Sequence, residues 1–411
     1  MNVLRCLSFT SPDQKKGPAQ RRKTCGIPAR RVRAGAAFAI AVGLSWSLLP
    51  STSAAADSQN KIVVPESPGL DVKVGETVLI KPAGMVPFAF QFADGRIRVD
   101  DQSSWAKDST DGGHTWCDAP VSNNGLWGVR IDLGGGEILS LGYATKKRAD
   151  GKYTLPLRRS LDGWNTVTEE TCVLDIPRSV PLVTDGGGHL DGFVMDHSIL
   201  LLKDSRLMAT MYGNYDEDKT FAEGYPASIP IMKTRAIVVF SSDKGKTWGN
   251  PVTVAILKDT QEGACEAGLA RAVNGDILCA MRSGGYPPAK PTPCYLCRST
   301  DEGQTWSGPQ AILPLGVSPR LCVMRNGMIV CTTGRPGNWL VFSKDDGRTW
   351  QGAFCFHQGG PWPTITCYNQ LYETAPDTIL VIYDRETEPK PGLDASKHEI
   401  VGTFFTVKKQ G

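Results

Sequence analysis

The sequence predicts an all-β chain folded as a six-bladed β-propeller. The motif S-x-D-x-G-x-T-W occurs at Ser109–Trp116, Ser241–Trp248, Ser299–Trp306 and Ser343–Trp350, and a weaker copy occupies Ser160–Val167. The copies start 44 to 81 residues apart, and 44 Gly and 28 Pro separate short apolar runs that lack a helical period. Small antiparallel sheets repeated at roughly 40 to 50 residues are typical of a propeller. At roughly 55 to 60 residues per blade, the chain beyond its leader holds six blades.

The repeated motif has the chemistry of a turn between two strands. Its Asp can accept hydrogen bonds from backbone N–H groups, and the Gly two residues later can adopt positive φ. Three copies directly follow an apolar, strand-like run, at Ala236–Phe240, Cys294–Arg298 and Trp339–Phe342. Thr and Trp then favour a second strand. Each copy is therefore predicted to be a strand–turn–strand unit.

Residues 1–56 have the layout of a secretory signal peptide. A basic stretch, Ala29–Gly35, precedes an apolar run, Ala36–Leu49, and small residues at Ser51–Ala56. The pair Arg30–Arg31 is a feature of the twin-arginine route. The alternative is an uncleaved anchor, for which the run is short. We expect export, cleavage near the end of the small residues, and a secreted or periplasmic protein without stable membrane insertion.

Residues 57–411 are predicted to form a single catalytic propeller domain. Here acidic residues outnumber basic ones by 41 to 36, which argues against a nucleic-acid partner. The longest gap between motifs has room for insertions at Thr184–Asp196 and Asp216–Ala227. Cys294–Cys297 has C-x-x-C spacing without a second pair, and no calcium-binding run is present, so we expect no metal and no cofactor. One or two disulfides are plausible, without an assignment.

The repeated motifs resemble the Asp boxes of the sialidase (neuraminidase) superfamily, and the chain beyond the leader resembles a six-bladed propeller of sialidase type. In that family the boxes are structural turns remote from the active site, so function must come from other residues. The resemblance implies a Tyr nucleophile assisted by a Glu, an Asp acid/base, and three arginines that bind the carboxylate of sialic acid.

Four residues match the family's pattern in chain order. The stretch "CEAGLARAVNGDILCAMR" supplies Glu266 and Arg282, "GRPGNWLVF" supplies Arg335, and "CYNQLYE" supplies Tyr368. A phenol is a weak nucleophile unless a neighbouring base takes its proton, which is the role of Glu266. Arginines suit a carboxylate because they donate paired, charge-assisted hydrogen bonds.

The chain departs from the family at the first arginine. Met85, in "GMVPFAF", stands where that arginine is expected. The loss of one charge-assisted contact weakens binding by roughly 1.5–3 kcal/mol. Either Arg96, Arg98 or Arg320 replaces the missing side chain, or the substrate is a related acidic sugar such as a uronic acid.

The acid/base and a second polar cluster complete the candidate residues. Asp100 and Asp101 lie shortly before the first motif, where the family places its acid/base, and each could also be a turn residue. The Gly-rich segment Asp185–His197 matches no motif of the family. Within it His189 and Asp191 either line the pocket or belong to an ordinary polar loop.

The first interpretation is an exported exo-glycosidase that hydrolyses a terminal α-linked sialic acid, or a related acidic sugar, with retention. The second is a propeller glycosidase or lyase that acts on uronates through His189. The third is a propeller that binds carbohydrate without catalysis, as the missing arginine suggests. The expected partner is a glycan with a terminal acidic sugar, and the expected state is a monomer.

Overall fold

The structure is a computed structural model, and it describes part of the chain. The described residues are 62–101, 104–121, 129–184, 187–285, 292–335, 337–359, 368–388 and 394–410. The predicted signal peptide lies outside these residues. Within them, no helix has the length and apolarity that a membrane crossing requires.

Four separate four-stranded sheets make up much of the fold. One contains β2 (Phe88–Gln91), β3 (Ile97–Asp100), β4 (Ala106–Ser109) and β5 (Cys117–Asp118). The next contains β17 (Cys265–Arg271), β18 (Ile277–Arg282), β19 (Cys294–Ser299) and β20 (Gln310–Leu313). A third contains β21 (Val317–Val323), β22 (Ile329–Gly334), β23 (Asn338–Ser343) and β24 (Gln351–His357). The last contains β25 (Gln370–Ala375), β26 (Thr378–Glu386), β27 (His398–Lys409) and β1 (Leu70–Lys81).

A nine-stranded sheet joins two further antiparallel series. The first series is β6 (Arg130–Asp132), β7 (Ile138–Leu141), β9 (Tyr153–Ser160) and β10 (Thr168–Leu174), with β8 (Lys146–Lys147) paired to β9. The second is β13 (Val194–Leu201), β14 (Leu207–Gly213), β15 (Arg235–Ser241) and β16 (Thr247–Ile256), and β16 pairs in parallel with β10. Between the series lies a hairpin of β11 (Leu182–Val183) and β12 (His189–Leu190). The short 3-10 helix η1 (Ala395–Lys397) precedes β27.

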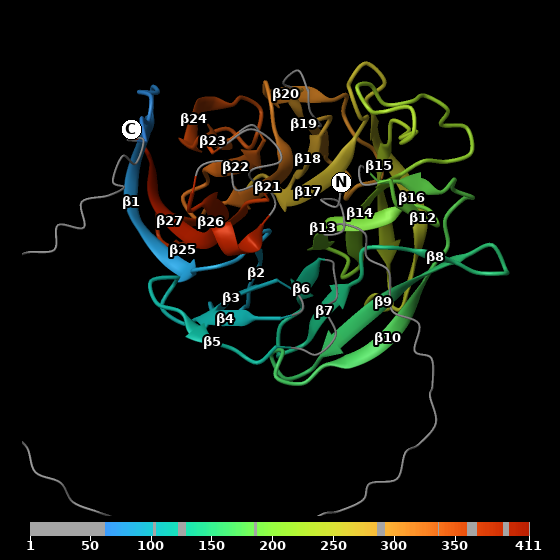
Figure 1. The fold of residues 1–411 in the computed structure, drawn as a ribbon, viewed down its shortest axis with the longest axis horizontal. Helices are drawn as coiled ribbons and strands as arrows, with labels where there is room; N and C mark the ends of the chain where they lie inside the picture. The colour runs from blue at the N-terminus through green and yellow to red at the C-terminus, as the bar shows by residue number, and fades with distance from the viewer. Residues whose placement is uncertain are drawn as a thin grey trace, which may run out of the picture.

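The sheets are arranged around a common centre (Figure 1). Their first strands contact one another in the order β6, β13, β17, β21, β25 and β2. β1 completes the last sheet by pairing with β27, from Leu70 opposite Lys409 to Lys81 opposite Ile400. The two ends of the described chain are thus joined within one sheet. This arrangement confirms the all-β prediction.

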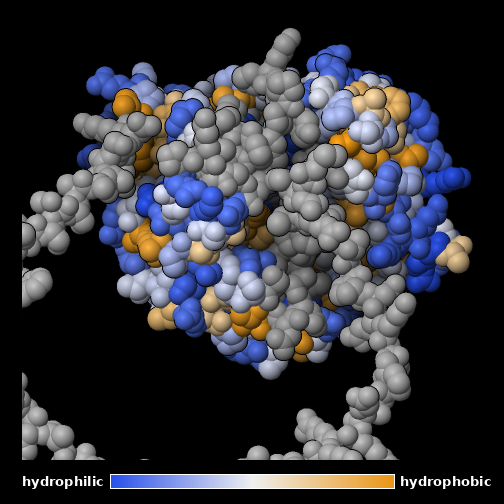
Figure 2. Space-filling view, in the orientation of Figure 1, coloured by the Kyte–Doolittle hydropathy of each residue, from blue (hydrophilic) through white to orange (hydrophobic). Residues whose placement is uncertain are grey.

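The core consists of apolar side chains between and within the sheets. Trp248, Tyr153 and Phe405 are among its largest fully buried members. Exposed large apolar residues are scattered, and the coloured part of the surface in Figure 2 is largely hydrophilic with small groups of apolar residues. The nine cysteines that the structure describes are free thiols, eight of them buried or half-buried, so they act as small apolar residues there.

The repeated motif forms the predicted turn between strands, as its copy at Ser299–Trp306 shows. Asp301 Oδ1 accepts hydrogen bonds from Ser299 Oγ at 2.8 Å and from the Thr305 N–H at 2.9 Å, and Asp301 Oδ2 accepts one from Thr305 Oγ1 at 2.6 Å. The Gly303 N–H donates to Ser299 Oγ, and the Trp306 indole donates to the Gly303 carbonyl. These bonds, those of Thr305 first, lower the pKa of Asp301. The turn thus lies between two strands, as predicted, but in this copy the second strand begins at Gln310 and not at Thr305.

The recurrence of the motif follows from contacts between sheets. The Gly of each copy lies against an apolar side chain of another four-strand series, which for Gly245 belongs to the same nine-stranded sheet: Gly113 against Leu380, Gly245 against Leu139, Gly303 against Met208 and Gly347 against Leu278. All four have positive φ. Each turn is therefore a packing contact between sheets as well as a connection, and a chain of several sheets needs several of them.

We expect Gly347→Ala to destabilise the fold by about 2–4 kcal/mol. The added β-carbon would lie 2.8 Å from Leu278 Cδ1, and the residue has a φ of +79°. Left-handed backbone costs a non-Gly residue roughly 1–2 kcal/mol and overpacking roughly 1–3 kcal/mol. Denaturant unfolding measures the loss. Gly308→Ala is the control, because no atom lies within 4 Å of its added β-carbon. Equal stability of the two variants would contradict the packing role.

Candidate functional site

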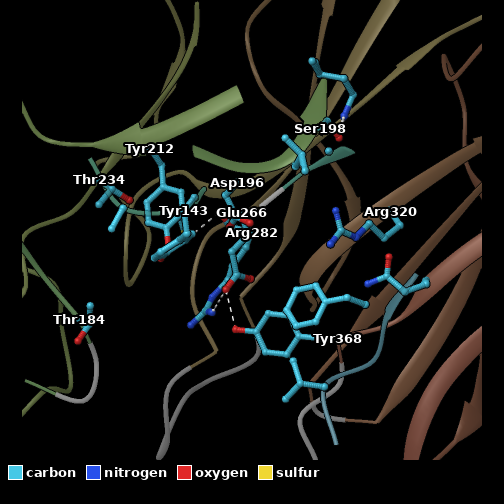
Figure 3. A pocket seen from close by; sticks show the side chains of 18 of the residues that line it. Tyr143, Thr184, Asp196, Ser198, Tyr212, Thr234, Glu266, Arg282, Arg320 and Tyr368 are labelled. Carbon is cyan, nitrogen blue, oxygen red and sulfur yellow. Dashed lines mark hydrogen bonds and ion pairs between the residues drawn. The ribbon is translucent and has the colours of Figure 1, made fainter. Parts of the chain in front are cut away.

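A cavity of about 500 Å³ lies where the first strands of the sheets meet. Its described walls come from β2, β6, β13, β14, β17, β18, β21 and β25, together with the β11–β12 hairpin and the segments that follow β7 and β14. Charged and aromatic side chains from several sheets point into it (Figure 3). The charged ones are Arg130, Asp196, Glu262, Glu266, Arg282 and Arg320.

Irregular pairing in three first strands occurs beside this cavity. The register shifts between Met195 and Ile199 in β13, between Cys265 and Gly268 in β17, and between Val317 and Arg320 in β21. Glu266 and Ser318 have left-handed φ values of 45° and 48°. Bulges re-aim side chains, and strained backbone is concentrated at functional sites. The cavity therefore has the backbone features of a working site.

The centre of the cavity is a hydrogen bond between Tyr368 and Glu266. Tyr368 Oη donates to Glu266 Oε1 at 2.9 Å, although the residues are 102 positions apart in sequence. The other oxygen of Glu266 accepts the Ser318 N–H at 2.9 Å. Glu266 is buried, so its carboxylate is held in one orientation toward the phenol. This is the geometry in which a carboxylate can take the proton of a hydroxyl.

Arg282 connects Glu266 to a second carboxylate, Glu262. Its Nη1 lies 2.8 Å from Glu266 Oε1 and its Nη2 lies 2.7 Å from Glu262 Oε2. Its Nε donates to the Gly284 carbonyl at 2.9 Å. Burial alone would lower the pKa of Arg282, but the two carboxylates raise it well above its usual value. Arg282 is thus a fixed cation beside the hydrogen-bonded pair of Tyr368 and Glu266, called the dyad below.

Two more arginines belong to this region, the buried Arg335 and the half-buried Arg320. The guanidinium of Arg335 lies 5.9 Å from the centroid of the Tyr368 ring, and Arg335 has a φ of 44°. Arg335 does not belong to the described lining of the cavity. Arg320 lines the cavity from β21. Burial lowers the pKa of Arg320, and the charge of Asp196 offsets part of that effect. An anionic group of a bound substrate would offset the same effect of burial on the pKa of Arg320.

Of the three arginines considered as replacements for the arginine missing at Met85, two bind an aspartate and one lines the cavity. Arg98 Nε and Arg96 Nη1 bind Asp108 at 2.7 and 2.8 Å. Neither they nor Met85 belong to the described lining of the cavity. Only Arg320, of the three, lines it.

Asp100 and Asp101 are not among the described residues that line the cavity. Asp100 Oδ2 accepts a hydrogen bond from Arg130 Nη2 at 2.8 Å. Asp101 Oδ1 accepts the N–H groups of Ser104 and Trp105 at 2.7 and 3.1 Å, which makes it the turn residue of the alternative interpretation. Both carboxylates therefore have partners within the protein, and the predicted acid/base role of either one stays a prediction.

Sequence reasoning missed Asp196, which does line the cavity. It lies on β13, within the register shift of that strand. It belongs to the polar segment that sequence analysis singled out, but the residues chosen there were His189 and Asp191. A strand pattern indicates which residues alternate between faces, and a bulge cancels that alternation, so no sequence signal distinguished Asp196.

His189 and Asp191 have separate environments. His189 is exposed on β12 and lines the edge of the cavity. Asp191 accepts the N–H of Lys147 at 2.9 Å and does not belong to the described lining. Of the two residues, the structure thus places only His189 in the described lining, and the catalytic role of His189 stays a prediction.

The remaining wall is aromatic. The hydroxyls of Tyr143 and Tyr212 lie 2.5 Å apart, and Phe88, Phe90 and Tyr225 also line the cavity. Burial raises the pKa of Tyr212 well above its usual value, and the nearby Tyr143 adds to the rise. The cavity thus combines charged and aromatic side chains, as small-molecule sites commonly do. Among the residues described, no cluster of three His, Cys, Asp or Glu could hold a metal ion.

No protein-family model matches the chain, and no curated protein matches it in sequence. Among solved structures, a protein of unknown function from Dyadobacter fermentans aligns with a TM-score of 0.60 at 17% identity, over 84% of this chain and 100% of that chain. The α-L-arabinofuranosidase Arb93A of Fusarium graminearum aligns with a TM-score of 0.55 at 16% identity, over 81% and 98%.

An α-L-arabinanase of Penicillium chrysogenum, solved with arabinobiose, aligns with a TM-score of 0.54 at 15% identity, over 81% of this chain and 98% of that chain. At these identities the likeness concerns the fold. The chain has the β-propeller fold that these glycosidases share.

Proposed function

We propose that the protein is a retaining exo-glycosidase that uses Tyr368 as its nucleophile. The hydrogen bond from Tyr368 to Glu266 is the observation that carries this proposal. A phenol bonded to a buried carboxylate inside a cavity is an activated nucleophile, whereas a purely binding site needs no such base. The likeness to an arabinofuranosidase and an arabinanase supports a glycosidase on this fold.

In the first step, Tyr368 Oη bonds to the anomeric carbon while Glu266 takes the phenolic proton. The bond from that carbon to the leaving oxygen breaks, and the oxygen receives a proton. We assign this acid role to Asp196, because it lines the cavity with the dyad and Asp100 and Asp101 do not. Water then attacks the anomeric carbon and gives a proton to Asp196. Glu266 returns its proton to Tyr368 as the covalent bond breaks.

We propose a terminal acidic sugar as the substrate, with α-linked sialic acid as its first candidate. Arg320 and Arg335 would bind the carboxylate, with Arg320 in place of the arginine that Met85 replaces. Arg320 in the cavity wall and Arg335, 5.9 Å from the centroid of the Tyr368 ring, support an anionic group at the reacting sugar. The neutral phenol supports it too, because a carboxylate nucleophile would repel such a substrate.

We further propose that the protein is an exported monomer with six blades. Six four-strand series in the described chain support the blade number. The order of basic, apolar and small residues in 1–56 supports a cleaved leader.

The test is release of dye from a fluorogenic α-sialoside by the purified protein without residues 1–56. Turnover supports the proposal. Turnover of a fluorogenic glucuronide alone would move the substrate to uronic acids, with His189→Ala as the variant that should then abolish it. Turnover of an α-L-arabinofuranoside alone would show that the arginines do not select an acidic sugar. The absence of turnover on all three, by protein shown to be folded, would overturn the enzyme proposal.

A further inference from the structure

A line of hydrogen bonds leads from the nucleophile to a segment inserted between two strands. Tyr368 binds Glu266, Arg282 binds both Glu266 and Glu262, and Tyr225 Oη donates to Glu262 Oε1 at 2.5 Å. Tyr225 belongs to the segment between β14 and β15. Neither Glu262 nor Tyr225 matches a motif or has a role in the steps above.

The charges along this line decide how basic Glu266 is. A guanidinium 2.8 Å away stabilises the anionic form of Glu266 and so weakens it as a base. Glu262 binds the same guanidinium at 2.7 Å from its other side. Both carboxylates are buried, so solvent screens their mutual influence only weakly. Arg282 is therefore shared between the two carboxylates. Glu266 has a higher affinity for the proton of Tyr368 than it would have if Arg282 bound Glu266 alone.

We propose that Glu262 is a positioning residue that keeps Glu266 basic by sharing Arg282, and that Tyr225 holds Glu262 in this position. The inference rests on the proposed role of the Tyr368–Glu266 dyad. The inserted segment is anchored next to Glu262, because the Glu223 N–H donates to the Gln261 carbonyl at 3.1 Å. The bond of 2.5 Å from Tyr225 has the length of a charge-assisted O–H···O⁻ bond.

Three variants separate charge from structure. Glu262→Gln removes the charge and keeps the shape. Glu262→Asp keeps the charge but moves it away from Arg282, because the side chain is one methylene shorter. Tyr225→Phe removes one hydrogen bond and leaves every charge in place. Two quantities are measured for each folded variant. One is the pH profile of kcat/KM on whichever fluorogenic glycoside the enzyme hydrolyses. The other is the NMR titration of the Tyr368 phenol in protein labelled at the tyrosine ζ carbon, assigned with Tyr368→Phe.

We expect Glu262→Gln to move the acidic limb of the profile down by about one pH unit and to lower kcat with little change in KM. The Tyr368 phenol should ionise at lower pH in the same variant. Glu262→Asp should shift both quantities in the same direction by less, which keeps the test decisive if Glu262→Gln does not fold. Tyr225→Phe should move the limb in the same direction by less than Glu262→Gln, because Glu262 keeps its charge but loses the bond that holds it beside Arg282.

The two proposals fail in different ways. An unmoved acidic limb and an unmoved phenol titration in both Glu262 variants would overturn the inference, while activity of the wild type would still support the proposed function. A shifted phenol titration in a protein that hydrolyses no glycoside would overturn the proposed function, while the charge coupling would stand.

Discussion

Tyr368→Phe is expected to lower kcat by roughly three orders of magnitude or more, with KM little changed. The substitution removes the oxygen that would bond to the anomeric carbon, so no covalent intermediate can form. Substrate binding is expected to persist, because the ring keeps its place beside Arg335, 5.9 Å from that guanidinium. Steady-state release of dye measures the loss. Mass spectrometry with a difluorinated sialosyl probe should show one adduct on the wild type and none on the variant.

The control for this variant is Tyr295→Phe. Tyr295 lies on β19 and does not belong to the described lining of the cavity. It should retain wild-type kcat and form the adduct. An adduct on Tyr368→Phe, or a kcat within about tenfold of the wild type, would show that another group attacks the sugar, and the proposed chemistry would fall.

The repeated motif made most of the fold predictable. Its Asp and Gly determine a local turn, and a local turn depends on few distant residues. The copy at Ser160–Val167 shows how far this determination extends. Trp164 occupies the Gly position with a φ of 72°, and its N–H still donates to Ser160 Oγ at 2.8 Å. The Asp and Ser bonds therefore maintain the turn even without glycine.

The site was predictable only in part, and the reason is long-range pairing. Glu266 and Tyr368 were identified through a resemblance, and the structure brings them within 2.9 Å. Asp100 was expected in the cavity, but Arg130 of a different sheet binds its carboxylate. Asp196 lines the cavity within a register shift of β13, and no residue pattern in the sequence predicts that shift. Sequence position therefore identified candidates, and tertiary contacts decided between them.

Glu262 shows the same limit for residues that touch the reacting groups indirectly. It lies four positions before Glu266, in a segment without a motif, and its importance depends on Arg282 of the next strand. Arg282 was predicted to bind substrate. In the structure its Nη2, Nη1 and Nε atoms contact Glu262, Glu266 and the Gly284 carbonyl, so these donors already have partners within the protein. The substrate's carboxylate is therefore assigned to Arg320 and Arg335.

Arg320→Gln tests that assignment, and we expect it to lower kcat/KM for an α-sialoside by roughly ten- to 150-fold. The estimate corresponds to one charge-assisted contact of about 1.5–3 kcal/mol. The variant also removes the positive charge that interacts with Asp196. This loss would slow the turnover of any substrate, whether charged or not. The methyl ester of the same sialoside separates the two effects, because it keeps the sugar and lacks the charge.

The ratio of kcat/KM for acid and ester is therefore the decisive quantity. If Arg320 binds the carboxylate, the wild type prefers the acid and Arg320→Gln loses most of that preference. Arg96→Gln is the control, because Arg96 binds Asp108 and the Gly163 carbonyl away from the cavity; its preference should equal that of the wild type. If Arg320→Gln slows the hydrolysis of acid and ester equally, Arg320 stabilises Asp196 and β13 and does not bind the carboxylate of the substrate. The sugar would then be recognised by Arg335 or by uncharged contacts.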